Sequence, residues 1–184
     1  MKWRERLVRF RSFWIFPILA CSLLYVGRRL EPARSYLELS WLVPLGLASW
    51  TLLEYGLHRF IFHMNNVHEL VSGSHRDHHT WPRDGDLILV HTWYGLFVSA
   101  TAYFAIFAVM QDAFRAAGMM SGIWAGFLYY ESVHYRVHMT NASSVVLTKQ
   151  RRSHFHHHFR DPTRCFGVTT PVWDYIFGTA GVRD

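Results

Sequence analysis

Ten of the 13 histidines in this sequence fall into four short clusters whose spacing suits metal binding. HYRVH places His134 and His138 four residues apart, one above the other on a helical face. HRDHH and HFHHH each hold three histidines at i, i+3 and i+4, again on one face of a helix. HRFIFH places His58 and His63 five residues apart, so these side chains converge only if the helix ends or distorts between them. The candidate ligands are His58, His63, His75, His78, His79, His134, His138, His154, His157 and His158.

Imidazole nitrogen binds zinc, copper, iron and nickel, and the clusters contain no cysteine that would select among these metals. One ion cannot take ten ligands, whereas two ions with about five each could leave a coordination position open for oxygen, water or substrate. A single cluster could be a surface or hydrogen-bonded feature, but four together predict a dimetal site. His68, His91 and His156 fit no cluster, and we interpret them as solvated, hydrogen-bonded or supporting residues.

Four carboxylates lie within four residues of a candidate ligand. A ligating imidazole usually donates its second N–H to a carboxylate or a carbonyl. Glu54 and Glu131 each stand about one helical turn before a candidate histidine, and we expect them to orient those rings. Asp77 and Asp161 have arginine neighbours, so they are either solvated or paired with those arginines.

Four apolar stretches must position the histidines. Residues 12–27, 87–110 and 116–130 contain no charged residue, and residues 39–57 contain only Glu54. A membrane-spanning helix needs about 20 apolar residues, and four such helices would overfill the core of a soluble protein of 184 residues. We therefore predict an all-α integral membrane protein formed by one domain over residues 1–184. The expected spans are residues 12–27, 39–57, 87–110 and 116–133, with a helical cap over residues 58–86 and 134–184.

The distribution of basic residues predicts the orientation. With four spans both termini share a side, and only Arg28, Arg29, Arg34 and Arg115 fall on the other side, which leaves 15 of the 19 Lys and Arg on the terminal side. The positive-inside rule makes that side the cytosol. Every histidine except His91 then lies on the cytosolic side, so the candidate ligands share one face of the membrane. Nucleic acid is not an expected partner, since the basic residues flank the spans and form no continuous stripe.

Five segments together resemble a known family. They are EYGLHRFIFHM (54–64), GSHRDHH (73–79), YYESVHYRVH (129–138), RRSHFHHHF (151–159) and FGVTTPVWDYIFGT (166–179). In order and internal spacing they are similar to the histidine boxes and closing segment of the fatty acid hydroxylase superfamily, and most similar to its fatty acid 2-hydroxylase branch.

The resemblance implies a membrane-bound di-iron oxygenase that hydroxylates a lipid C–H bond with dioxygen and two electrons. It implies that the same ten histidines bind two iron ions, which zinc could replace in a purified sample. It favours hydroxylation of a fatty acyl chain at carbon 2. Because no cytochrome b5 domain precedes the first box, we expect a separate electron donor of the ferredoxin or cytochrome type, and we expect the bacterial inner membrane as the location.

Other interpretations remain open. A sterol desaturase or methyl oxidase and a carotenoid hydroxylase carry similar boxes, and a metal-binding or metal-transporting membrane protein would also use histidine. Transporters place their ligands along the spans, whereas these histidines gather at one end. Four aromatic residues either line a substrate channel or belong to the aromatic belt that is usual at membrane interfaces: Trp93, Tyr94, Tyr129 and Tyr130.

Overall fold

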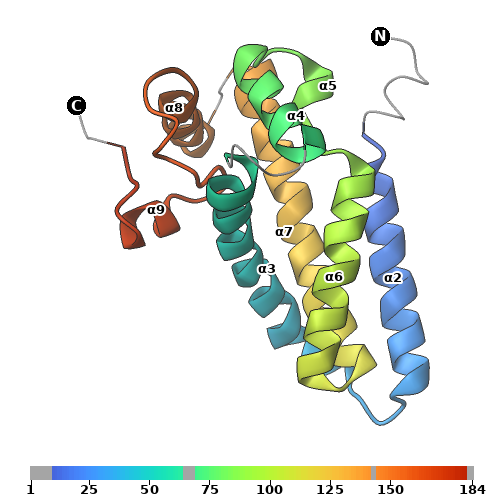
Figure 1. The fold of residues 1–184 in the computed structure, drawn as a ribbon. Coiled ribbons are helices and arrows are strands. Elements are labelled where there is room, and N and C mark those ends of the chain that lie inside the picture. The colour runs from blue at the N-terminus through green and yellow to red at the C-terminus, as the bar shows by residue number, and fades with distance from the viewer. Residues whose placement is uncertain (1–9, 64–68, 142–143, 182–184) are drawn as a thin grey trace. The chain divides into compact units, whose positions relative to one another are not determined.

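The computed structural model of the chain describes residues 10–63, 69–141 and 144–181, and over these ranges it contains helices and no strand (Figure 1). The prediction of an all-α protein is confirmed. His68 lies outside the described residues. The helices are α2 (Ser12–Leu30), η1 (Tyr36–Glu38), α3 (Leu39–Gly56), η2 (Leu57–Phe62), α4 (Glu69–Thr80), α5 (Gly85–Ile88), α6 (Thr92–Met110), α7 (Ala113–Met139), α8 (Val145–Phe159) and α9 (Val172–Ile176).

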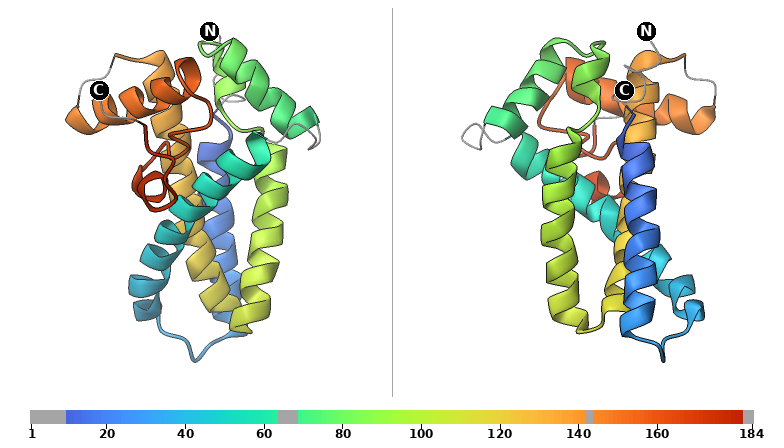
Figure 2. Two further views of the ribbon diagram at one scale, coloured as in Figure 1. Left: turned by 60° about the vertical axis from the view of Figure 1, so that its left-hand side comes forward. Right: turned by 90° about the vertical axis from the view of Figure 1, so that its right-hand side faces the viewer.

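The chain divides into two compact units, and the division passes within α3 and within α7. Unit 1 comprises residues 1–50 and 90–128, and unit 2 comprises residues 51–89 and 129–184. In unit 1, α2 and α6 lie beside the parts of α3 and α7 that belong to it (Figure 2). All ten candidate ligands belong to unit 2.

Close backbone contact joins α3 and α7 in unit 1. A Cβ atom added to Gly46 would lie 2.0 Å from the carbonyl oxygen of Met119, and one added to Gly122 would lie 2.1 Å from the carbonyl oxygen of Val43. Without glycine at these two positions the helices could not approach so closely. Small residues serve this purpose in helix pairs within membranes, where burial of apolar side chains gives little advantage over contact with lipid.

Aromatic rings complete the core of unit 1. The ring of Phe16 on α2 lies 5.6 Å from that of Trp124 and 5.1 Å from that of Phe127, both on α7. Phe127 also contacts Trp50 of α3 at a ring separation of 5.4 Å. These edge-on and tilted contacts make α7 the helix that α2 and α3 both pack against.

Three helical segments among the described residues are long and apolar enough to cross a membrane: Ser12–Leu30, Tyr36–Phe62 and Gly85–Met110. They correspond to the first three predicted spans. The fourth predicted span, residues 116–133, lies in α7 and is not confirmed. α7 contains glycine, tyrosine and the charged Glu131, which lower its mean hydropathy, and apolar side chains such as Met120 and Ile123 are buried within unit 1.

Ion pairs join the two connections of unit 1. Arg34, between α2 and η1, binds Asp112, between α6 and α7, at 2.5 Å. Arg115 binds Glu38 of η1 at 2.6 Å. The α2–α3 and α6–α7 connections therefore meet at one end of unit 1 (Figures 1 and 2).

Candidate metal centre

A distorted helix brings the first two candidate ligands together. η2 is a π-helical turn in which hydrogen bonds join residues five apart, so His58 and His63 lie near one face instead of about 140° apart. Their ring centroids are 5.2 Å apart. The distortion that the five-residue spacing requires is therefore present. Helical turns of this kind occur frequently at functional sites.

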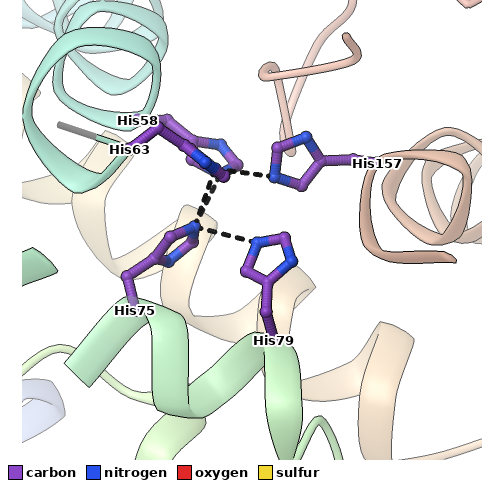
Figure 3. A group of neighbouring side chains, drawn as sticks. All are labelled: His58, His63, His75, His79 and His157. Atoms are coloured by element: carbon purple, nitrogen blue, oxygen red, sulfur yellow. Dashed lines mark hydrogen bonds between the residues drawn. The ribbon is translucent and has the colours of Figure 1, made fainter. Parts of the chain in front are cut away.

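The ten candidate ligands form two groups, and within each group one ring nitrogen per residue lies within 4.8 Å of the others. The first His group is His58, His63, His75, His79 and His157, drawn in Figure 3. The second His group is His78, His134, His138, His154 and His158. α4 and α8 contribute to both groups, because the i, i+4 pair of each helix enters one group and the third histidine enters the other.

The Nε2 atoms of the first His group are spaced like ligand atoms around one metal ion. Nε2 of His75 lies 3.2 Å from Nε2 of His58, 3.0 Å from that of His63 and 3.1 Å from that of His79 (Figure 3). Nε2 carries either one proton or one lone pair, so it cannot satisfy three such neighbours by hydrogen bonding. Nitrogens bound at right angles to one ion at about 2.1 Å would stand about 3 Å apart. The geometry therefore fits a shared ion.

The second His group has the same close spacing. Nε2 of His134 lies 3.0 Å from Nε2 of His78, and Nε2 of His138 lies 2.8 Å from that of His154. Both ring nitrogens of His158 are buried, and neither has a hydrogen-bond partner among the described residues. Buried polar atoms in native proteins are nearly always paired. A metal ion would satisfy this ring and its neighbours together.

Backbone carbonyls set the tautomer of two rings in the first His group. Nδ1 of His58 lies 2.6 Å from the carbonyl oxygen of Phe166, and Nδ1 of His157 lies 2.7 Å from that of Arg164. A neutral imidazole that donates through Nδ1 keeps a lone pair on Nε2. Both rings thus present Nε2 to the group in the form that binds a metal.

Glu54 supports this arrangement through a loop. Its carboxylate accepts hydrogen bonds from the backbone N–H groups of Val168, at 2.7 Å, and Thr169, at 2.9 Å, and from the Thr169 hydroxyl. These residues lie two and three positions after Phe166, whose carbonyl orients His58. Glu54 therefore positions the loop that positions the ring. Glu131 is fully buried three residues before His134, and its orienting role stays a prediction.

Asp174 is a positioning residue that the histidine spacing did not reveal. Its buried carboxylate accepts from the N–H groups of Phe166 and Gly167, both at 2.9 Å, and from the Thr179 hydroxyl at 2.8 Å. Burial raises the pKa of Asp174, while these donors oppose the rise. The sequence feature that could have identified Asp174 is the closing segment FGVTTPVWDYIFGT, in which Asp174 is the only acidic residue.

Burial also determines the protonation of the imidazoles. Desolvation, reinforced by neighbouring rings, lowers the pKa of His78 to about 2 and that of His79 and His138 to about 4. Desolvation likewise lowers the pKa of His157 to about 3 and depresses that of His75 well below 6.5. These rings are neutral near pH 7, which is the form that a metal requires.

The remaining histidines lie outside both groups. His91 is exposed at the start of α6 in unit 1. His156 is turned toward Cys165, with Nδ1 3.9 Å from Sγ. Asp77 is exposed, and Asp161 accepts hydrogen bonds from Thr163 and forms an ion pair with Arg164 at 3.3 Å.

The aromatic residues divide between the two units. Tyr130 stacks on His134 at a ring separation of 5.4 Å, and Tyr129 is exposed. Trp93 and Tyr94 belong to unit 1. A channel function of these four residues stays a prediction.

Residues 43–179 match the family model described as fatty acid hydroxylase. The chain belongs to the fatty acid hydroxylase family. The matched range contains all ten candidate ligands, Glu54 and Asp174. This membership confirms the resemblance and the prediction of a lipid-hydroxylating enzyme.

Individual family members agree with this assignment. The chain is 30% identical over 178 residues to the dihydroceramide fatty acyl 2-hydroxylase FAH2 of Arabidopsis thaliana, covering 91% of this chain and 73% of that protein. It is 33% identical over 143 residues to the fatty acid 2-hydroxylase of Rattus norvegicus, covering 73% of this chain but 38% of that protein. The solved structure of full-length scs7p, in which only the hydroxylase domain is visible, superposes with a TM-score of 0.82 and 25% identity over 98% of this chain and 70% of that one.

Proposed function

We propose that this chain is a membrane-bound dimetal oxygenase that hydroxylates a fatty acyl chain at carbon 2. The observation that carries the proposal is the pair of five-histidine groups, in which the closest Nε2 atoms are 2.8–3.2 Å apart. The names of the relatives support the acyl substrate and the 2-position over a sterol or carotenoid. We treat residues 1–184 as one hydroxylase-type domain.

The first His group would hold one ion and the second His group the other. Iron is the metal we propose, because attack on an unactivated C–H bond needs a redox-active ion and zinc has no redox chemistry. When bound, an iron pair would supply the reduction of dioxygen and the removal of a hydrogen atom from the acyl chain. Zinc fits the same ligands and would give an inactive protein.

Aromatic side chains line part of the first His group. The Phe166 ring lies 5.6 Å from the rings of both His58 and His63 and 5.4 Å from that of His157. Phe62 lies 5.4 Å from the ring of His75. An apolar wall of this kind favours neutral imidazole and contact with a hydrocarbon chain over contact with water.

The position of η2 supports attack near the head of the lipid. The candidate span Tyr36–Phe62 ends in η2, so His58 and His63 lie at the end of an apolar helix. At a membrane interface the carbons next to a lipid headgroup are nearer than the chain terminus. Carbon 2 is therefore the carbon that such a site would reach first.

The same proposal includes a specific topology. α7 would be the fourth span, with the first three as found and both termini in the cytosol, as the Lys and Arg distribution favours. We propose the bacterial inner membrane as the location of the protein. The proposed electron donor is a separate ferredoxin or cytochrome. Cysteine-scanning labelling of the α2–α3 and α6–α7 connections from outside intact cells tests the orientation.

The decisive test combines metal analysis with isotope labelling. We expect the purified chain to bind two irons and, after reduction with dithionite, to place one oxygen atom from labelled dioxygen on carbon 2 of an acyl lipid. His157→Ala should lose iron and at least 100-fold of the hydroxylation, in line with the large effect of removing a ligand. His156→Ala is the matched control on the same helix, and it should keep both its iron content and its hydroxylation activity.

Two outcomes would contradict the proposal. A labelled oxygen found only on a sterol or carotenoid would reject the acyl substrate. Full iron content and full hydroxylation in His157→Ala would reject the ligand assignment.

A further inference from the structure

The two faces of α8 differ in chemistry. One face carries His154, His157 and His158 into the His groups. The opposite face borders a groove of about 480 Å³ lined by α8 residues that include Arg152, Phe155 and Phe159. The wall that separates this groove from the second His group is therefore a single helix.

The outer surface of α8, which includes the groove, is strongly basic. Lys149 and Arg152 are exposed and stand three residues apart on α8, and the helix contains no acidic residue. Arg151 is held in place, because its Nε donates to the carbonyl oxygen of Val137 at 2.9 Å and its guanidinium lies over the Phe155 ring. A cationic surface beside the exposed ring of Phe159 suits an anionic protein partner.

Aromatic rings connect this face to the second His group. Phe159 is 60% exposed, and its ring lies 5.7 Å from that of His158. Phe155 lies 5.3 Å from Phe159 and 5.6 Å from the ring of His138. A redox group docked in the groove would thus be one aromatic ring away from two candidate ligands.

The proposed reaction creates the need for such a surface. Hydroxylation converts C–H to C–OH with one oxygen atom of dioxygen, and the other oxygen atom is reduced to water by two electrons and two protons. Those two electrons must enter from a carrier outside the metal centre. Encounters between electron carriers and their partners are small and transient, and charge complementarity guides them.

We propose that the outer face of α8, defined by Lys149, Arg152, Phe155 and Phe159, docks an acidic one-electron carrier protein that delivers electrons to the second His group. This inference rests on the proposed function. A membrane surface rich in anionic lipid would also be attracted to the basic residues. The ring contacts to His158 and His138 favour the carrier, because a path of aromatic rings to the candidate ligands serves electron transfer and does not contribute to the binding of lipid headgroups.

Charge reversal tests the docking surface. Lys149→Glu/Arg152→Glu should weaken binding of purified, acidic [2Fe–2S] ferredoxin or cytochrome b5 at least 10-fold, measured by titration of the oxidised carrier. Carrier-driven hydroxylation should need a correspondingly higher carrier concentration and should lose its dependence on salt. Hydroxylation driven by dithionite should equal that of the wild type. Arg83→Glu is the control, since Arg83 is exposed in unit 2 but not on α8.

A second variant examines the electron path. Phe159→Leu keeps an apolar side chain but removes the ring, so hydroxylation at saturating carrier should slow several-fold while carrier binding stays within twofold. A uniform loss with both carrier and dithionite would show only damage to the fold and would reject the path.

The remaining outcomes distinguish a failure of the docking surface from a failure of the proposed hydroxylase function. Unchanged carrier binding in the double variant would overturn the docking surface, and so would a wild type that turns over with dithionite but with neither carrier. Loss of binding to vesicles containing phosphatidylglycerol, with carrier binding intact, would assign the surface to lipid. A wild type that forms no hydroxylated lipid in any assay would reject the proposed function and this inference with it.

Discussion

In unit 1, Gly46 and Gly122 bring α3 and α7 into backbone contact, whereas in unit 2 the continuations of the same two helices carry Glu54 and His134. Along α7 the buried residues change from Ala116 and Met120 to polar groups such as Glu131 and His138. The backbone conformation is helical throughout, so the difference lies only in what each helix buries.

The comparison shows two ways to stabilise helices. Unit 1 relies on close packing, which needs small residues at the contacts and no ligand. Unit 2 buries neutral imidazoles and carboxylates, and each buried polar group costs free energy unless it is paired. Unit 1 should therefore keep its structure without metal, whereas unit 2 should stay folded but open locally more often.

The largest expected effect is that of metal removal. A chelator should abolish hydroxylation and raise amide hydrogen exchange at least 10-fold in α4 and α8, because five rings per site lose their common partner. Exchange in α2 and α6 should stay unchanged. Mass spectrometry measures the exchange. An equal rise of exchange in both units would contradict the proposed difference between them.

A smaller effect is expected from a methyl group in unit 1. Gly122→Ala places a Cβ atom 2.1 Å from the Val43 carbonyl oxygen, so α3 and α7 must separate, at a cost of about 1–3 kcal/mol for overpacking. Thermal unfolding in detergent measures the loss. Gly56→Ala is the control, since its Cβ would have no neighbour within 4 Å. Equal stability of both variants would contradict the close contact.

An isosteric change in unit 2 should affect one site more than the other. Asp174→Asn replaces an acceptor of two N–H groups by an amide whose NH₂ faces one of them, which loosens the loop behind Phe166. The affinity of the first His group for metal should fall about 10-fold. Equilibrium dialysis should show the loss of one metal before the other. Asp77→Asn, on the exposed side of α4, should leave both affinities unchanged.

The smallest effect is that of mild acid on the metal-free chain. Above pH 6.5 the histidines are neutral in both the folded and unfolded states. Between about pH 6.5 and 4 the unfolded chain binds protons, whereas folded His79 and His138, with pKa values of about 4, do not. Stability should therefore fall as the pH drops through this range, by several degrees in the melting temperature. A melting temperature that stays constant or rises would contradict the burial of these rings.

Much of unit 2 could be predicted from residue spacing alone. The i, i+4 pair His134 and His138 needs only a regular helix to share a face, and the two groups contain all ten histidines that spacing selected. The five-residue gap between His58 and His63 required a distorted helix, which η2 provides. The fourth predicted span, in α7, is not among the helical segments that are apolar enough to cross a membrane, and many of the apolar side chains of α7 are buried in unit 1.

Residue spacing predicts which side chains share a helical face, because helical geometry relates neighbours within one turn or two. It could not assign His78 and His79, adjacent on α4, to different groups. It also could not single out Asp174 or the Phe166 carbonyl as partners of the site, since a backbone acceptor carries no side-chain signature. These points become visible in the folded chain, because contacts between distant segments depend on how whole helices pack.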